Sequence, residues 1–340
     1  MSETVDSVLL ADVGGTNVRF ALADPARAAP LVAESIRRYR VADFATFSDS
    51  ASTYLGALGA RPRHGVFAFA GQIRGGEVEV TNHTWTVSRE RMRVDLQLDS
   101  LHFVNDFAAM SLSVPLLGAK DLAAIGDMPP PVLDAGRAQT FAVIGPGTGL
   151  GVGALLVRDG VTSALETEGG HASFAPRTDE EIEVLRVLTA RFGRVSHERL
   201  LCGSGLSNLH EALGRVHGTF EERLPPEEIT RRADAGFDAG CVRAVEAFCE
   251  LLGAVAGDFV LSFGAWDGAY LAGGLTPLLL PWLKKGGFRR RFADKGRFAD
   301  ALARIPSIAI LHPDAGLLGA AAYAVSDSGR ALVRAAGSSR

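Results

Sequence analysis

Two glycine-threonine stretches of the same kind are the strongest indication of fold in this chain: Asp12-Val13-Gly14-Gly15-Thr16-Asn17 near its start and Gly145-Pro146-Gly147-Thr148-Gly149-Leu150-Gly151 near its middle. Each follows a short apolar run and precedes another, which predicts a strand, a tight turn and a strand in both places. Glycine permits positive φ and lets bare N–H groups approach an anion, and threonine adds a hydroxyl donor. Two loops of matching chemistry therefore favour a pair of nucleotide-phosphate loops.

Other phosphate motifs do not fit these loops. No register of residues 145–153 satisfies the G-x-G-x-x-G spacing of a Rossmann fingerprint, and neither loop has the lysine of a Walker A motif. A plain hairpin turn remains the alternative for either loop alone. Asp12 ends the strand before the first loop, which indicates a carboxylate that holds Mg²⁺ through water, because Mg²⁺ keeps much of its hydration shell.

The composition limits the class of protein. The length of 340 residues, 47% of them hydrophobic, suffices for about two domains. The net charge of −4 gives no basic footprint for nucleic acid, and no long apolar run or basic leader indicates a membrane or secretory segment. We therefore expect a cytoplasmic protein. The three cysteines, Cys202, Cys241 and Cys249, lack C-x-x-C spacing and are expected to be buried free thiols.

The order of apolar runs predicts two related α/β domains. Up to about residue 106, expected strands at 8–13, 18–23, 65–70, 77–81 and 101–104 alternate with polar and helical stretches, including a helix at 44–58. A proline-rich, linker-like patch at 126–131 lies where a second domain would begin. The second half opens with the hairpin around Gly147 and becomes helical. Because both halves contain a hairpin with a phosphate-type turn, we expect the nucleotide to bind in the crevice between them.

Asn105 and Asp106 follow an expected buried strand, immediately before a helical stretch. Ligands collect at the carboxyl ends of strands in open α/β sheets, so Asp106 is a candidate general base with Asn105 as a neutral hydrogen-bond partner. The alternative is that one of the two residues simply caps the next helix, as such residues commonly do.

Glu168-Gly169-Gly170-His171 is a second candidate, because two glycines between an acid and a histidine form a sharp turn that can direct both side chains to one pair of hydroxyls. A solvent-facing turn is the alternative. His171 has no partner cysteine or histidine nearby, which argues against zinc. Glu198 is a weaker candidate, because an acid behind Ser196 is ordinary for the first turn of a helix.

Taken together, these motifs resemble the bacterial hexokinase-type glucokinases, members of the actin-like ATPase superfamily. The resemblance covers nearly the whole chain. It is carried by the two glycine loops, Thr81-Asn82-His83-Thr84-Trp85, Asn105-Asp106-Phe107, Glu168-Gly169-Gly170-His171, Ala272-Gly273-Gly274 and Gly316-Leu317-Leu318-Gly319. Several ordered motifs are far more specific than any one of them.

The resemblance implies an α/β fold of the actin-like ATPase (ribonuclease H-like) type, with two α/β domains flanking a nucleotide and sugar cleft. Residues 1–116 with 312–340 would form the small domain and residues 117–311 the large one. It implies that Asp106 acts as the base toward the sugar 6-hydroxyl. The remaining hydroxyls would be held by Asn105, Glu168, His171 and Glu198. The ATP phosphates would be cradled by Ala11, Asp12, Val13, Gly14, Gly15, Thr16, Gly147, Thr148 and Gly149, and the adenosine would lie against Gly273 and Gly274.

The function implied is ATP- and Mg²⁺-dependent phosphorylation of glucose to glucose 6-phosphate, the first step of glycolysis, by a homodimer that binds neither nucleic acid nor membrane. Structural zinc is not expected, because Phe174-Ala175-Pro176 stands where a related family of sugar kinases and repressors has a cysteine-rich zinc motif. A kinase for another hexose or an N-acyl amino sugar remains an alternative. So does a catalytically silent, sugar-responsive regulator, for which we would expect a DNA-binding module before the first strand.

Overall fold

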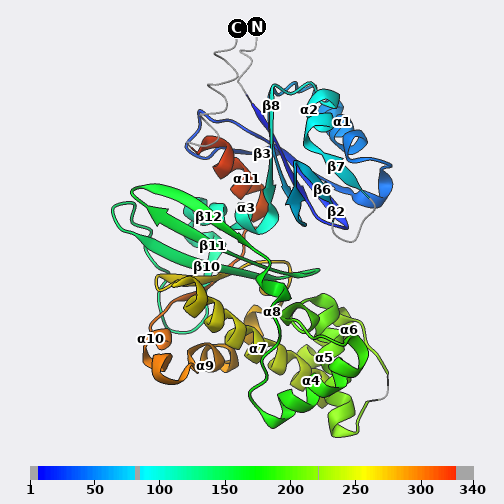
Figure 1. Ribbon diagram of the computed structural model, residues 1–340, viewed down its shortest axis with the longest axis vertical. Helices are drawn as coiled ribbons and strands as arrows, with labels where there is room; N and C mark the ends of the chain where they lie inside the picture. Colours follow the sequence, from blue (N-terminus) through cyan, green and yellow to red (C-terminus); the bar gives the residue numbers. More distant parts are fainter. Residues whose placement is uncertain (1–6, 81–84, 221, 327–340) are drawn as a thin grey trace. The chain divides into compact units, whose positions relative to one another are not determined.

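A computed structural model describes residues 7–80, 85–220 and 222–326 (Figure 1). The chain divides into two compact units. Unit 1 comprises Met1–Leu117, Thr162–Glu166 and His312–Arg340, and unit 2 comprises Gly118–Val161 and Thr167–Leu311. Both units combine a mixed sheet with packed helices, so the α/β class predicted from the sequence is confirmed.

The main sheet of unit 1 has the strand order β3-β2-β1-β4-β8. Its strands are β1 (Val8–Val13), β2 (Asn17–Ala23), β3 (Leu31–Arg40), β4 (His64–Phe69) and β8 (Ser100–Asn105). The first three strands form an antiparallel meander, whereas β4 pairs parallel with both β1 and β8. A smaller antiparallel sheet contains β5 (Ile73–Arg74), β6 (Glu77–Glu79) and β7 (Thr86–Ser88).

Helices cover both faces of the main sheet of unit 1. Alternate residues of β1 point to opposite faces. Leu9 and Ala11 join a core with α1 (Phe47–Leu58), whereas Val8 and Leu10 join a core with α11 (Ala315–Val325). Burial on both faces explains the uninterrupted apolar run at residues 8–11 in β1. The remaining helices of this unit are α2 (Arg89–Asp95) and α3 (Asp106–Ser113).

The helix predicted at 44–58 begins three residues later, at Phe47. Thr46 caps it: the Thr46 hydroxyl accepts a hydrogen bond from the Asp49 N–H at 3.1 Å, and the Asp49 carboxylate accepts one from the Thr46 N–H at 3.1 Å. This reciprocal capping box satisfies two N–H groups that have no partner within the helix. Phe44 and Ala45 therefore lie before the helix, although their apolar character continues its periodicity.

The six-stranded sheet has the strand order β12-β11-β10-β13-β14-β9, and its strands belong to unit 2 except for Thr162–Glu166 of β12, which are assigned to unit 1. Its strands are β9 (Leu122–Ala124), β10 (Gln139–Pro146), β11 (Leu150–Arg158), β12 (Val161–Thr167), β13 (Gly268–Leu271) and β14 (Ser307–Ile310). Helices gather on one side of this sheet (Figure 1). They are α4 (Asp179–Phe192), α5 (Gly203–His217), α6 (Pro226–Ala235), α7 (Ala239–Phe263), α8 (Leu275–Leu283), α9 (Gly287–Ala293) and α10 (Ala299–Ala303).

The two units repeat one arrangement of strands. In unit 1, β1 pairs antiparallel with β2 and parallel with β4; in unit 2, β10 pairs antiparallel with β11 and parallel with β13. Each pair of antiparallel strands is joined by one of the two glycine loops. The prediction of two related halves that share a hairpin is therefore confirmed at the level of strand pairing.

The structure overturns two expectations. The proline-rich patch at 126–131 is not a linker, because it follows β9 inside unit 2. The chain passes between the units after Leu117, Val161, Glu166 and Leu311. The glycines of the two hairpin turns are also not required for positive φ, since none of them is among the described residues with positive φ. At Gly149 the reason for glycine is a close contact, described below.

One close helix contact gives a stability prediction for unit 1. A Cβ added to Gly319 of α11 would lie 1.6 Å from the backbone carbonyl oxygen of Ala109 in α3. A backbone oxygen cannot rotate away, so Gly319→Ala must separate the two helices. We expect the free energy of unfolding to fall by about 3 kcal/mol or more, at the upper end of overpacking costs. Chemical denaturation followed by circular dichroism measures this change.

The matched control is Gly56→Ala in α1, where an added Cβ would have no heavy atom within 4 Å. Alanine is the better helix former, so this variant should be stabilised by about 0.5–1 kcal/mol. Equal denaturation midpoints for the two variants would contradict the packing of α11 on α3.

Candidate active site

The first glycine loop joins the C-terminal end of β1 to the start of β2 in the sheet of unit 1. Ala11, Asp12 and Val13 are the last residues of β1, and Gly14, Gly15 and Thr16 form the turn. The turn is closed by a hydrogen bond from the Gly14 N–H to the Asn17 carbonyl at 3.0 Å, and the Thr16 carbonyl accepts one from the Val41 N–H at 3.0 Å. The loop is thus fixed at both ends of the turn, as a rigid anion cradle requires.

The Asp12 carboxylate lies in a partly buried cluster of charges. It accepts a hydrogen bond from the Arg19 guanidinium at 2.9 Å, and Asp314 is 3.9 Å from Arg19 and 2.7 Å from Arg38. Burial raises the pKa of Asp12; Arg19 opposes this shift and Asp314 adds to it. An added Cβ at Gly316, in the first turn of α11, would lie 2.8 Å from the Asp12 carboxylate, so this helix end approaches Asp12 closely.

Asn105 and Asp106 lie at the same end of the sheet as Asp12, where β1 and β8 finish. Val13 is paired with Phe69, and Phe69 with Asn105, so β1 and β8 end level with each other across β4. Two strand spacings place the backbones of β1 and β8 about 10 Å apart. The carboxylate that follows β8 and the carboxylate near the end of β1 are therefore held a fixed, short distance apart by the sheet.

The capping alternative holds for Asn105, whose side-chain oxygen accepts hydrogen bonds from the N–H groups of Phe107 at 2.9 Å and Ala108 at 3.1 Å. This cap uses the carbonyl oxygen and leaves the amide NH₂ group as the donor available to a ligand. The Asp106 carboxylate accepts a hydrogen bond from the Phe107 N–H at 2.9 Å. Both side chains are half-buried. The start of α3 thus holds both residues in place.

The second glycine loop joins β10 to β11 in unit 2. The Gly147 N–H donates to the Gly149 carbonyl at 2.8 Å, and the Gly147 carbonyl accepts a hydrogen bond from the Gly203 N–H at 2.9 Å. At the other side of the turn, the Leu150 N–H donates to the Glu198 carboxylate at 2.9 Å. An added Cβ at Gly149 would lie 2.5 Å from this carboxylate, so the loop accepts only glycine there without displacing Glu198. Thr148 is exposed between the two glycines.

Gly273 and Gly274 lie against this second loop. Gly273 has φ +81°, and an added Cβ would lie 2.5 Å from the Pro146 carbonyl oxygen, so both backbone conformation and space require glycine. Gly274 precedes α8, whose first N–H groups have no partner within the helix. The structure therefore brings the two segments predicted to contact nucleotide in unit 2 side by side.

Glu168 and His171 lie at the two ends of a short 3₁₀ turn that follows β12. Both are exposed, so the structure is consistent with a solvent-accessible turn as well as with a ligand site. Gly170 is buried against β11, where an added Cβ would lie 2.0 Å from the Leu150 carbonyl oxygen. The His171 carbonyl accepts a hydrogen bond from the Arg194 guanidinium. The turn from Glu168 to His171 therefore packs against the backbone of Leu150, the residue whose N–H donates a hydrogen bond to Glu198.

Several residues that organise these loops are not evident from the sequence alone. Arg19 and Asp314 complete the charge cluster around Asp12, and Gly203 and Arg194 hold the two turns of unit 2. The one available signal was the charge of Arg19 inside an otherwise apolar strand. Asn82 and His83, which belong to a motif of the resemblance, lie outside the described residues. Trp85 is buried and packs edge-on against Phe47.

All three cysteines are buried free thiols, as predicted. Burial raises the pKa of Cys241 and of Cys249 to about 12, so these thiols stay protonated near neutral pH. Over the described ranges, no cluster of three or more His, Cys, Asp or Glu side chains could hold a metal ion by itself. Nor is any helix in those ranges long and apolar enough to cross a membrane.

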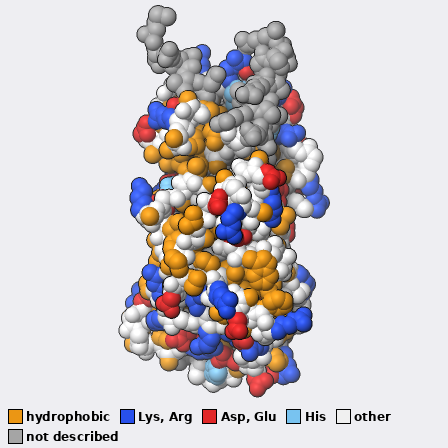
Figure 2. Space-filling model, turned by 90° about the vertical axis from the view of Figure 1, so that its left-hand side faces the viewer, with side chains coloured by type: hydrophobic (Ala, Val, Ile, Leu, Met, Phe, Trp, Pro, Cys, Tyr) orange, Lys and Arg blue, Asp and Glu red, His pale blue; other side chains and the backbone are white. Residues whose placement is uncertain are grey.

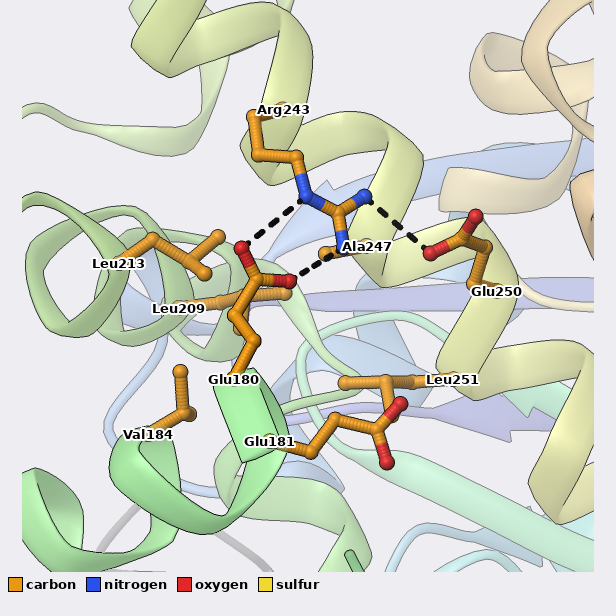
Figure 3. A pocket seen from close by; sticks show the side chains of 9 residues that line it. All are labelled: Glu180, Glu181, Val184, Leu209, Leu213, Arg243, Ala247, Glu250 and Leu251. Atoms are coloured by element: carbon orange, nitrogen blue, oxygen red, sulfur yellow. Dashed lines mark hydrogen bonds and ion pairs between the residues drawn. The ribbon is translucent and has the colours of Figure 1, made fainter. Parts of the chain in front are cut away.

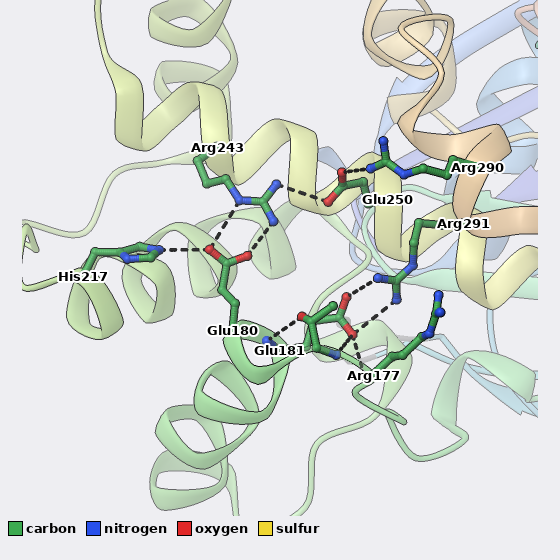
Figure 4. A network of polar contacts seen from close by, with 9 residues as sticks. Arg177, Glu180, Glu181, His217, Arg243, Glu250, Arg290 and Arg291 are labelled. Atoms are coloured by element: carbon green, nitrogen blue, oxygen red, sulfur yellow. Dashed lines mark hydrogen bonds and ion pairs between the residues drawn. The ribbon is translucent and has the colours of Figure 1, made fainter. Parts of the chain in front are cut away.

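A pocket between α4, α5 and α7 lies apart from these loops within unit 2 (Figure 3). Its polar side chains belong to an ion-pair network (Figure 4), in which Glu180 contacts His217 and Arg243, and Glu250 contacts Arg243 and Arg290. Hydrogen bonding to Arg243, and then to His217, lowers the pKa of Glu180. Because its carboxylates are already paired with basic side chains, we interpret this pocket as part of the packing of three helices.

The face of the molecule drawn in Figure 2 carries acidic and basic side chains that are interspersed with each other.

Comparison with known proteins gives consistent matches along the chain. A family model described as Glucokinase matches residues 9–327. A glucokinase of Stenotrophomonas maltophilia (strain K279a) is 51% identical over 324 residues, which cover 95% of this chain and 96% of that protein. The structure of a glucokinase from an Antarctic psychrotroph matches with TM-score 0.80 at 31% identity and covers 93% of this chain and 98% of its own. A ROK family glucokinase from Streptomyces griseus, solved with glucose and AMPPNP, matches with TM-score 0.61 at 16% identity, covering 93% and 98% respectively.

Proposed function

The chain belongs to the glucokinase family, and we propose how its residues transfer the γ-phosphoryl group of ATP to the 6-hydroxyl of glucose. The fold is the actin-like ATPase fold, as the resemblance implied. The observation that carries the residue assignments is the repeated hairpin: each unit presents a glycine turn beside the ends of parallel strands, where α/β sheets bind their ligands.

Unit 1 supplies the residues that we assign to proton transfer. Asp106 receives the proton of the 6-hydroxyl as the oxygen attacks the γ-phosphorus, and the Asn105 amide donates a hydrogen bond to a neighbouring sugar hydroxyl. Support comes from the start of α3, where the hydrogen bonds of both side chains to the Phe107 N–H fix their orientation. A fixed base is what general catalysis needs, because the proton acceptor must be within hydrogen-bond reach of the hydroxyl.

Both glycine turns are assigned to the phosphates of ATP. We assign Ala11 to Thr16 in unit 1 and Gly147 to Gly149 in unit 2 to phosphate binding. The Gly14 and Gly147 N–H groups close the turns themselves, so the N–H groups that follow them in each turn and the exposed hydroxyls of Thr16 and Thr148 would bind the phosphates. Gly273 and Gly274 contact the adenosine, because they lie directly beside the second turn. Phosphoryl transfer requires mainly positioning and stabilisation of charge, which rigid turns of N–H donors provide.

Asp12 fits a site for Mg²⁺ that arrives with ATP. Mg²⁺ is commonly bound by one or two carboxylates together with phosphates and water, and this cluster offers Asp12 with Asp314 close by. Mg²⁺ bound there would neutralise charge on the β- and γ-phosphates. Arg19 already pairs with Asp12 and keeps the carboxylate oriented at the strand end.

Glu168, His171 and Glu198 of unit 2 are assigned to the remaining sugar hydroxyls. Glu168 and His171 lie in one turn. That turn packs against Leu150, and Glu198 accepts a hydrogen bond from the Leu150 N–H. We also propose that the protein is a cytoplasmic homodimer that uses ATP and glucose and binds neither nucleic acid nor membrane. The enzyme is expected to produce ADP and glucose 6-phosphate from equimolar substrates, and a coupled assay of glucose 6-phosphate formation tests this proposal.

The assignment of Asp12 predicts a dependence on Mg²⁺ and not on zinc. Activity should be lost when EDTA removes divalent cations, return on addition of excess Mg²⁺, and survive a zinc-selective chelator, since His171 lacks the partners of a tetrahedral zinc site. Asp12→Asn should raise the Mg²⁺ concentration needed for half-maximal rate by about tenfold or more, because it removes the anionic ligand. Stoichiometric zinc in the purified protein, with activity lost on its removal, would contradict this account.

A further inference from the structure

Glu198 is bonded directly to the second glycine turn, although it is assigned to the sugar. Its carboxylate accepts a hydrogen bond from the Leu150 N–H at 2.9 Å, and a Cβ added at Gly149 would lie 2.5 Å from the same carboxylate, so a side chain there would displace Glu198. Glu198 is half-buried, in a 3₁₀ turn after Ser196. One oxygen of the Glu198 carboxylate thus accepts a hydrogen bond from the loop. A carboxylate has two acceptor oxygens, so Glu198 can also accept hydrogen bonds from sugar hydroxyls.

The segment after Glu198 holds the opposite end of the same turn. The Gly203 N–H donates to the Gly147 carbonyl at 2.9 Å, and the Leu201 N–H donates back to the His197 carbonyl at 2.9 Å. The segment from His197 to Gly203 is therefore hydrogen-bonded to the second glycine loop at Gly147 and at Leu150. A displacement of Glu198 would be transmitted to Gly147 and Leu150, which lie on either side of Thr148 and Gly149.

We propose that Glu198 is a positioning residue of the nucleotide site: its carboxylate orders the Gly147–Gly149 turn for phosphate binding whether or not sugar is bound. The inference deepens the proposed function and rests on its assignment of this turn to ATP. A preordered loop binds its ligand more tightly because less conformational freedom is lost on binding. Sugar hydroxyls that engage Glu198 would then act on the nucleotide site through a single side chain.

The test measures nucleotide affinity in the absence of sugar, where a residue that only binds glucose has no effect. Binding of AMPPNP with Mg²⁺ to the full-length protein is measured by isothermal titration calorimetry. Glu198→Ala should weaken it by about tenfold, the scale of one hydrogen bond to a charged group. Glu198→Gln keeps an acceptor oxygen for the Leu150 N–H, and should bind the nucleotide within about threefold of wild type.

Glu168→Ala is the matched control. Glu168 is also assigned to glucose and lies in the same unit, but its side chain is exposed, and its carboxylate forms no hydrogen bond with the Gly147–Gly149 turn in the described part of the chain. This variant should bind AMPPNP like wild type while its KM for glucose rises. If Glu198→Ala fails to fold, Glu198→Asp replaces it, since the shorter side chain keeps the charge but not the reach to Leu150.

Unchanged AMPPNP affinity in a folded Glu198→Ala or Glu198→Asp variant would overturn the inference. So would an equal loss of affinity in Glu168→Ala, because the effect would then be general to unit 2. Both outcomes leave the proposed function intact if wild type phosphorylates glucose with ATP. Failure of wild type to do so would overturn the proposed function itself.

Discussion

Asp106→Asn should lower kcat for glucose phosphorylation by roughly 100-fold or more, the scale of a lost general base. Asparagine preserves the shape of the side chain and its oxygen can still accept the Phe107 N–H, so the start of α3 should remain intact. It cannot take up a proton from the sugar hydroxyl. KM for ATP and for glucose should therefore stay within about threefold of wild type, because binding contacts are kept while the transition state loses its proton acceptor.

Asp99→Asn is the control for this variant. Asp99 immediately precedes β8, at the opposite end of the strand from Asp106, and forms an exposed ion pair with Arg63. Exposed pairs contribute little, so kcat should be unchanged. Steady-state kinetics of both variants decide the question. Turnover by Asp106→Asn within about threefold of wild type would remove Asp106 from the reaction, because a lost base should cost close to 3 kcal/mol.

The second large effect concerns selectivity among sugars. A site built to hydrogen-bond a hydroxyl rejects an analogue that lacks it by up to about 10⁴-fold, because a polar group is left without a partner. The penalty should depend on burial. Loss of a ring hydroxyl that engages half-buried Asn105 or Glu198 should lower kcat/KM by roughly 10²- to 10⁴-fold, whereas loss of one held only by exposed Glu168 or His171 should cost less.

Kinetics with the series of monodeoxyglucoses measure these penalties at saturating ATP and Mg²⁺. 6-Deoxyglucose should inhibit weakly and never react, since it lacks the accepting oxygen. Identical kcat/KM values for glucose and every monodeoxyglucose that retains the 6-hydroxyl would show that the assigned side chains do not hold the ring hydroxyls.

Much of this architecture could be predicted from the chain itself. Glycine turns between apolar runs located both hairpins, and the run at 101–104 located the strand that positions Asp106. The signal is strong in these places because local turn chemistry and apolar periodicity agree. The edge strand β3 was missed, since its exposed face carries charged residues and its sequence has no continuous apolar run.

The contacts that organise the site were not predictable from sequence, because they join residues far apart in the chain. Nothing local indicates that Asp314 lies beside Arg19, or that the Leu150 N–H finds its acceptor in Glu198. From the neighbouring residues alone, Glu198 is indistinguishable from an ordinary acid in the first turn of a helix. Only the folded chain places its carboxylate against the glycine turn, 2.5 Å from where a Cβ at Gly149 would lie.

The most direct test of the central claim is a comparison of kcat/KM for glucose and N-acetylglucosamine, with wild-type protein, saturating ATP and Mg²⁺, and identification of the product. The account predicts glucose 6-phosphate as the product. It also predicts a kcat/KM for N-acetylglucosamine at least about tenfold lower, because the acetamide would displace polar contacts around position 2, which we assign to the exposed side chains of Glu168 and His171. Equal kcat/KM values for the two sugars, or no glucose 6-phosphate at all, would contradict it.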